Sequence, residues 1–165
     1  MKPKLGPSKE MKIVLAGLDN AGKSSMLVAI KKMYQFIEDV RNLEPTIRID
    51  YYQRDFLGLE LNFWDFGGQK KYRDRYIQRH VYFDNIDTMI YLIDIQDPER
   101  FDESLEYLGE ILAILEEVEY EKDNKIFICF SKMDYEQAFT KKPEYISNLA
   151  RLRNEIREIF PSFSF

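Results

Sequence analysis

The feature that most constrains the fold is the stretch GLDNAGKSS at residues 17–25. It follows the apolar run MKIVLAG at 11–17, which predicts a buried strand, and it precedes a helical pattern over about 23–36. The spacing Gly17-x-x-x-x-Gly22-Lys23-Ser24, set between a strand and a helix, is that of a phosphate-binding loop. Loop N–H groups and the helix N-terminus favour phosphate oxygens. The predicted phosphate-binding residues of this loop are Asp19, Asn20, Ala21, Gly22, Lys23, Ser24 and Ser25.

Strands alternate with helices along the rest of the chain, apart from one hairpin. This order predicts an α/β fold with a mostly parallel sheet and helices on both faces. Residues 1–10 are expected to form a loose polar arm, and 11–165 a single domain. The expected strands after the loop are 46–56, 59–66, 89–95 and 125–130, with the first two forming an antiparallel hairpin through Leu57-Gly58. The expected later helices follow Gln69, Asp97-Pro98 and Pro143.

Composition narrows the function classes. The 165 residues are 45% hydrophobic, enough for one ordinary domain with a core. The formal net charge of −5 argues against nucleic acid as a partner. Cys129 is the only cysteine, so an intramolecular disulfide is impossible, and its apolar surroundings in IFICF indicate a core residue. The single histidine, His80, cannot build a metal site alone and is expected to have a surface or packing role rather than a catalytic one.

A second motif, FWDFGGQ at 63–69, ends an apolar strand. Asp65 is predicted to hold Mg²⁺ through water, and Ser24 to ligate the same ion through its hydroxyl. Gly68 can donate its N–H to a γ-phosphate, and Gln69 can orient an attacking water as the catalytic residue. Alone, the motif is a common turn, but with the phosphate loop some forty residues earlier it indicates an NTPase.

A third motif, FSKMD at 130–134, follows another apolar strand and is expected at the same edge of the sheet. Asp134 can accept hydrogen bonds from guanine, the stem of Lys132 can lie along the base, and Ser131 begins the motif. Taken alone these residues are ordinary loop composition. Because the first two motifs precede them in the chain, these residues favour the binding of guanine over adenine.

These three motifs together resemble the Ras-like superfamily of small GTPases, and GLDNAGKSS with WDFGGQ is most similar to its Arf and Arf-like branch. The resemblance implies a GTP-binding G domain that binds GTP or GDP with Mg²⁺ and hydrolyses GTP slowly. Thr46 of EPTIRID would then ligate Mg²⁺ in the GTP-bound state. Nucleotide-dependent switch segments would be read by effector, exchange-factor and activating proteins. Ile49 and Trp64 are then either on a partner surface or packed in the core.

The sequence departs from the Arf pattern at several places. Arg48 stands where that branch has glycine, which leans toward the Rag/Gtr type of GTPase and raises the expectation of a dimer. Ser131 replaces an asparagine of the guanine motif, which predicts weaker nucleotide binding or looser base selection. Lys2 replaces the myristoylated glycine, so we expect a cytoplasmic chain without a direct membrane anchor, associating with membranes only through a partner. The family's last strand and helix are expected to be missing after Phe165, as in a C-terminally truncated domain.

Two other functions remain open. In one, the chain holds a nucleotide with little turnover, as a scaffold or dimerisation module, which Ser131 favours and Gln69 opposes. In the other it is an ATP-using P-loop kinase or ATPase, which Lys132 and Asp134 oppose. A catalytic arginine is expected to come from a partner. Three arginines follow Gln69 on the next helix: Arg73, Arg75 and Arg79. A catalytic role in cis for one of them stays open, although a solvated helix face or a partner contact is the expectation.

Overall fold

The computed structural model describes residues 9–31, 48–56, 59–118, 125–133 and 144–161. These residues form one five-stranded sheet with the strand order β2-β3-β1-β4-β5. The strands are β1 (Lys9–Gly17), β2 (Ile49–Phe56), β3 (Leu59–Phe66), β4 (Thr88–Asp94) and β5 (Lys125–Ser131). The helices are α1 (Lys23–Lys31), α3 (Lys70–Ile77), α4 (Phe101–Glu117) and α6 (Glu144–Ile159), with the short 3₁₀ turns η1 (His80–Phe83) and η2 (Pro98–Arg100).

All strand pairs in this sheet are parallel except β2 and β3, which pair antiparallel. The predicted mixed α/β sheet with one antiparallel hairpin is therefore confirmed. In the register of the central strand β1, Leu15 lies opposite Asp65 of β3, and Gly17 lies opposite Leu92 of β4. This register brings the ends of β1, β3 and β4 together at one edge of the sheet.

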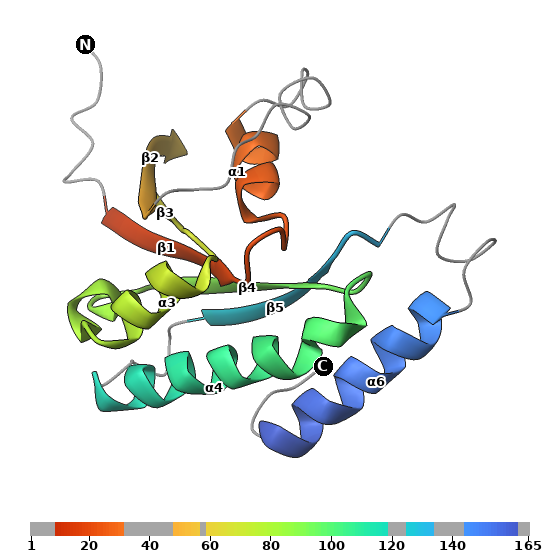
Figure 1. Cartoon of the computed structure of the whole chain (residues 1–165). Coiled ribbons are helices and arrows are strands. Elements are labelled where there is room, and N and C mark those ends of the chain that lie inside the picture. Colours follow the sequence, from red (N-terminus) through yellow and green to blue (C-terminus); the bar gives the residue numbers. More distant parts are fainter. Residues whose placement is uncertain (1–8, 32–47, 57–58, 119–124, 134–143, 162–165) are drawn as a thin grey trace, which may run out of the picture.

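The helices cover both faces of the sheet, with α1 on one face and α3, α4 and α6 on the other (Figure 1). Side chains alternate between these faces along each strand. Leu15 and Phe63 pack with Leu27 of α1, whereas Val14 and Phe66 face the helices on the opposite side. The larger core therefore lies under α3, α4 and α6, and the smaller one lies under α1.

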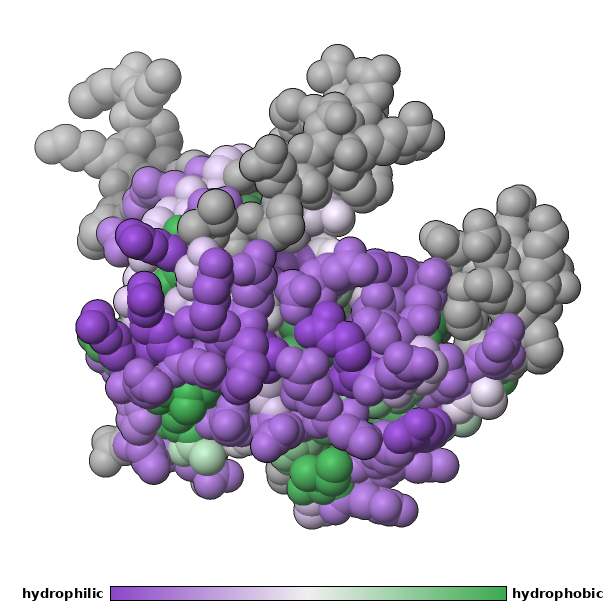
Figure 2. Space-filling model, in the orientation of Figure 1, coloured by the Kyte–Doolittle hydropathy of each residue, from purple (hydrophilic) through white to green (hydrophobic). Residues whose placement is uncertain are grey.

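The outer surfaces of these helices are polar. Figure 2 shows that hydrophilic residues dominate the drawn face, with apolar atoms in small separate groups. Helix α4 carries its buried leucines and isoleucines on one side and glutamates between them, as an amphipathic helix does. None of the helices in the described ranges has the length and apolar character needed to cross a membrane.

The structure differs from the expected boundaries in a few places. Strand β1 begins at Lys9, inside the expected arm, because Lys9 and Glu10 pair with β3. Asp97-Pro98 opens the 3₁₀ turn η2, and α4 starts only at Phe101. Cys129 is half-buried on the α1 side, where it packs against the smaller core. His80 is exposed, which agrees with the surface alternative of its two expected roles.

Several expectations lie outside the described residues. They concern Thr46, the Leu57-Gly58 turn, Asp134, the helix beyond Lys31 and the tail after Pro161.

Gly17 provides a test of how β1 meets β4. Its φ is +135°, and a Cβ built on it would lie 2.4 Å from the carbonyl oxygen of Leu92. We expect Gly17→Ala to lower the free energy of unfolding by about 2 kcal/mol or more, because backbone strain and a clash with a backbone atom add together.

The matched control is Gly109→Ala in α4, where an added Cβ would meet Phe160 at an ordinary 3.8 Å. Helix propensity predicts that this second change is neutral or stabilises by up to about 1 kcal/mol. Urea denaturation of both variants measures the difference, and equal stabilities would contradict the account of Gly17.

Candidate functional site

The predicted phosphate loop turns sharply between β1 and α1. Gly17 and Gly22 have φ values of +135° and +88°, and Asn20 adopts the left-handed region at +63°. The N–H of Ala21 donates to the carbonyl oxygen of Leu18 at 3.3 Å, which closes the turn. The helix α1 begins at Lys23, directly after the turn, and the dipole of a helix favours an anion at its N-terminus.

The side chain of Lys23 is held inside this loop. Its amine donates to the carbonyl oxygens of Gly17 at 3.1 Å and Leu18 at 2.6 Å, and only 5% of the residue is exposed. Burial lowers the pKa of Lys23 to about 8, although the negative charge of Asp65 acts in the opposite direction. A phosphate beside this amine would restore the charge stabilisation that burial removes.

Ser24 and Asp65 meet across two separate segments. The Ser24 hydroxyl donates to Oδ2 of Asp65 at 2.5 Å, and Asp65 is 1% exposed. A hydroxyl and a carboxylate are hard oxygen donors of the kind that Mg²⁺ prefers, and both lie beside the loop that would carry its phosphate ligands. The residues present therefore fit a magnesium ion, with Ser24 and Asp65 as the described part of the donor set.

The segment after Asp65 lies directly on the phosphate loop. A Cβ built on Gly68 would come within 2.2 Å of the backbone nitrogen of Asp19, so only a glycine allows this approach. Gln69 follows as the residue that precedes α3. Gly68 therefore adjoins the loop, while the chemical roles of Gly68 and Gln69 stay a prediction.

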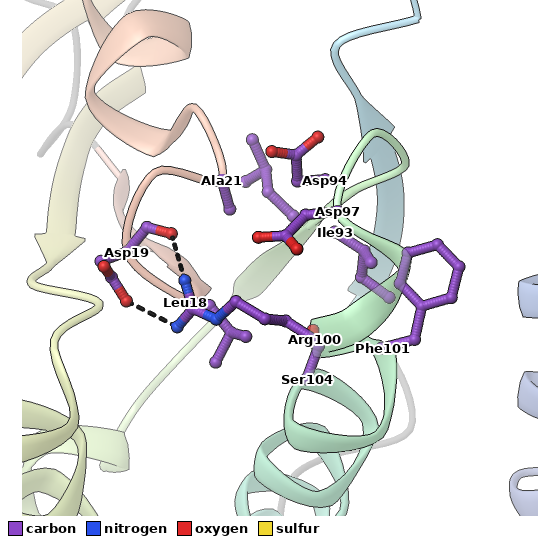
Figure 3. A pocket seen from close by; sticks show the side chains of 10 residues that line it. Leu18, Asp19, Ala21, Ile93, Asp94, Asp97, Arg100, Phe101 and Ser104 are labelled. Atoms are coloured by element: carbon purple, nitrogen blue, oxygen red, sulfur yellow. Dashed lines mark hydrogen bonds and ion pairs between the residues drawn. The ribbon is translucent and has the colours of Figure 1, made fainter. Parts of the chain in front are cut away.

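A chain of charged side chains connects the phosphate loop to Gly68, in the segment that follows Asp65. Arg100 of η2 contacts Oδ1 of Asp19 at 2.8 Å (Figure 3) and Oε2 of Glu103 at 3.0 Å. Glu103 also pairs with Arg73 of α3, whose Nε donates to the carbonyl oxygen of Gly68 at 2.9 Å. Two carboxylates and two guanidinium groups therefore link the loop with Gly68, and we call these four side chains the charge network.

The charge network shifts the pKa values of its acids. Burial raises the pKa of Asp19, but the hydrogen bond and charge of Arg100 outweigh it and hold the pKa below its ordinary value. Burial likewise opposes the shift at Glu103, where hydrogen bonds from Arg100 and Arg73 lower the pKa. The hydrogen bond to Asp19 raises the pKa of Arg100. All of these groups are therefore ionised at neutral pH.

Arg73 differs from the two arginines that follow it on the chain. It is 6% exposed and packs 5.0 Å from the ring centroid of Tyr107, whereas Arg75 and Arg79 are exposed. The expectation that all three lie at a solvated face or a partner contact is wrong for Arg73. Its burial under α4 and its bond to Gly68 prevent it from facing solvent.

The third motif lies at the same sheet edge, after β5. The Ser131 hydroxyl donates to the carbonyl oxygen of Ile93 at 3.1 Å, and Ser131 also lies near Gly22 of the loop. Lys132 has a left-handed φ of +57°, and its amine pairs with Asp94 at 2.7 Å. Ser131 thus adjoins the phosphate loop and Lys132 lies beside Asp94, while Asp134 lies outside the described residues. Their roles in binding guanine stay a prediction.

Sequence reasoning missed Asp94, Arg100 and Glu103 as parts of this site. Asp94 ends an apolar strand at the same sheet edge as the three motifs, and that position is a signal that could have identified it. Arg100 and Glu103 carry no such signal, because a 3₁₀ turn and a helix bring them to a loop some eighty residues earlier.

Arg100→Gln tests the charge network. At neutral pH we expect it to lower the free energy of unfolding by about 1 kcal/mol, since both ion pairs of Arg100 are partly exposed. The folded pKa values of Asp19 and Glu103 lie below their ordinary values of 3.8 and 4.5, so these pairs stabilise the fold above about pH 4.5. That stabilisation is lost as the pH falls through the lowered values.

Urea denaturation at pH 7 and pH 3 measures the effect, with the exposed Arg153→Gln of α6 as the control. A stability difference between wild type and Arg100→Gln that is equally large at both pH values would contradict the assignment.

Comparisons with known proteins agree with this geometry. The sequence model of the ADP-ribosylation factor family matches residues 1–163. The chain is 40% identical over 105 residues to ADP-ribosylation factor-like protein 3 of Caenorhabditis elegans, a match covering 63% of this chain and 53% of that protein. The protein of the same name from Chlamydomonas reinhardtii is 40% identical over 105 residues, covering 62% of this chain and 54% of that protein. The matches thus span about half the length of these curated relatives, and the family match, with the phosphate loop and the adjoining Asp65 and Gly68, shows that this chain belongs to the ADP-ribosylation factor family, in the Arf-like branch of the Ras superfamily.

Proposed function

We propose that this chain is a GTP-binding molecular switch that binds GTP or GDP with Mg²⁺, hydrolyses GTP slowly and presents nucleotide-dependent surfaces to partner proteins. The observation that carries the proposal is the convergence of three segments at one edge of the sheet. Lys23 is buried in the phosphate loop, Asp65 contacts Ser24, and Gly68 lies against the loop backbone. Open α/β sheets bind nucleotides at this edge.

In the proposed complex, the loop amides and Lys23 hold the phosphates. Ser24 would ligate Mg²⁺ directly, Asp65 through water, and Thr46 would complete the set when GTP is bound. The ion would supply positive charge to the phosphate oxygens. The hydroxyl of Ser24 now donates to Asp65, so this hydrogen bond would give way to shared coordination.

The switch itself would depend on Gly68. Its backbone touches the loop at Asp19, so a γ-phosphate bonded to the Gly68 N–H must separate these two backbones. Arg73 binds the carbonyl oxygen of Gly68 and belongs to α3, so a displaced Gly68 would carry the start of α3 with it. Effector, exchange-factor and activating proteins could read that displacement.

Guanine is the proposed base. Lys132 and Asp134 would contact it, and Ser131, which precedes them in the sequence, lies near Gly22 of the loop. Because the Ser131 hydroxyl already donates to Ile93, it is committed to the neighbouring strand. This commitment favours a second candidate, a nucleotide-holding scaffold or dimerisation module with little turnover.

Competition between nucleotides tests the choice of base. A fluorescent GDP analogue bound with Mg²⁺ is displaced by unlabelled GTP or ATP, and we expect GTP to compete roughly a hundredfold better, as a site built on base hydrogen bonds does. Lys23→Met serves as the control and should lose binding of both nucleotides. Equal or better competition by ATP would overturn the guanine assignment.

Gln69→Leu distinguishes the switch from the scaffold. We expect the single-turnover rate of GTP hydrolysis to fall roughly tenfold or more, because the attacking water loses its orienting group. Nucleotide affinity should stay the same. Gln78→Leu, a change at the exposed residue that follows α3, is the matched control. A hydrolysis rate that is unchanged in Gln69→Leu would rule out the catalytic role and support the scaffold.

A further inference from the structure

A groove of about 430 Å³ lies between α4 and α6, which run along the same face of the sheet (Figure 1). One face of each helix lines it, and we call it the α4–α6 groove: Asp102, Leu105, Glu106 and Gly109 of α4, with Glu155 and Ile159 of α6. The four residues of α4 have the i, i+3, i+4, i+7 spacing of a single helix face. No residue of the phosphate loop belongs to this lining.

The packing inside the chain does not require a glycine at position 109. A Cβ built on Gly109 would meet the ring of Phe160 at 3.8 Å, which is an ordinary contact. Glycine in the interior of a helix is less favourable than alanine, and Gly109 lies in the middle of α4. The open space at this position instead allows another molecule to approach the backbone of α4 closely.

All charged residues of α4 are acidic, and three of them form a row along the groove. Asp102, Glu106 and Glu110 are exposed at i, i+4 spacing, so their charges repel one another and destabilise the helix. Arg151 of α6 lies 3.5 Å from Asp102. Glu106 and Glu110 have no cationic partner among the residues that the structure describes. The row therefore leaves uncompensated negative charge on one side of the groove.

The α6 wall adds a carboxylate with spare capacity to accept a hydrogen bond. Glu155 accepts a bond from Nε of Arg151 at 2.6 Å through Oε1, whereas Oε2 is buried and has no hydrogen-bond partner in the described part of the chain. A buried acceptor without a donor is costly. Because Arg151 also pairs with Asp102, one guanidinium serves both walls, and the groove favours further positive charge.

The spacing of the acids limits what can bind. Asp102 and Glu110 are eight residues apart, about 12 Å along the axis of α4, so one small cation cannot reach both. A helix that carries lysine or arginine at every fourth position repeats this spacing. Apolar side chains on the adjacent stripe of such a helix would meet Leu105 and Ile159, and Ile159 is 53% exposed.

We propose that the α4–α6 groove binds a basic amphipathic helix of a partner protein. The apolar stripe of that helix packs on Leu105 and Ile159 and passes closely over Gly109. Its basic side chains pair with Glu106 and Glu110. This arrangement is the helix-in-groove mode of recognition. The proposal does not depend on the proposed switch function, because the groove and the phosphate loop share no residue.

Selection from a phage library of helical peptides tests the groove, with the full chain as bait. We expect the enriched peptides to carry lysine or arginine at i, i+4 spacing beside a stripe of leucine, isoleucine or phenylalanine. Fluorescence anisotropy then measures the affinity of a labelled synthetic copy. Glu106→Lys should weaken its binding roughly tenfold, because this change sets a positive charge against the basic face of the peptide.

A second variant tests the apolar contact. Gly109→Leu fills the space over α4 and should also weaken peptide binding roughly tenfold. Neither change should lower the unfolding midpoint, because Glu106→Lys relieves repulsion within α4 and leucine favours a helix more than glycine does.

Glu116→Lys is the matched control for charge. It makes the same change at another exposed residue of α4, roughly 15 Å along the helix from Glu106. It should leave peptide binding unchanged at physiological salt, where charges at this separation are screened.

Enriched peptides without basic residues would overturn the proposal, and so would equal affinity of a basic peptide for wild type and Glu106→Lys. Equal weakening by Glu106→Lys and Glu116→Lys would also overturn it, because the attraction would then be to net charge alone. Self-association of the chain in sedimentation that Gly109→Leu abolishes, with no peptide enriched, would assign the groove to a second copy and reject the partner helix.

Titration with the fluorescent GDP analogue identifies which proposal fails. Glu106→Lys should bind this analogue as the wild type does, since Glu106 lies away from the phosphate loop. Absent nucleotide binding in the wild type, with the basic peptide still bound through Glu106, would reject the switch function alone and leave the groove assignment standing.

Discussion

The parallel register of β1 and β3 is the constraint on which the site depends. Leu15 lies opposite Asp65, so the loop that leaves β1 and the glycines that leave β3 begin at the same level of the sheet. The pleat then directs Phe63 and Asp65 toward α1, while Trp64 and Phe66 face the larger core. A slip of one residue would exchange these faces, removing Asp65 from Ser24 and placing Phe66 at the site.

The charge network positions the Gly68 peptide and contributes little to the stability of the fold. Arg100 is 30% exposed and its carboxylate partners about 40%, so solvent screens both ion pairs. Arg73, the buried member of the charge network, is shielded from solvent. It lies under α4, and its Nε donates to the carbonyl oxygen of Gly68. A guanidinium held in this way fixes the direction of the Gly68 peptide, whose N–H is the group proposed to meet a γ-phosphate.

The backbone of Arg48 is strained, and its carbonyl oxygen accepts two hydrogen bonds. A left-handed conformation costs a non-glycine residue about 1–2 kcal/mol. Two hydrogen bonds to its carbonyl oxygen, from Tyr76 and Gly67, are of the size needed to offset this cost. The same residue therefore joins the start of β2 to α3 and to the segment after β3.

The sequence by itself determined the features that depend on residues close together in the chain. The glycine spacing of the loop predicts its sharp turn, the alternation of Leu61 and Phe63 predicts a half-buried strand, and the order of strands and helices predicts a mixed sheet. It also placed Asp65 and Gly68 beside the loop, because parallel strands end at one edge.

The tertiary structure alone decided contacts between residues far apart in the chain. Arg100 reaches Asp19 across 81 positions, and Lys132 reaches Asp94 of the neighbouring strand. From the sequence, Arg73, Arg75 and Arg79 are equivalent basic residues. Only the packing of α3 against α4 buries Arg73 and leaves Arg75 exposed, since burial depends on which side of a helix its neighbours cover and not on the residue's own chemistry.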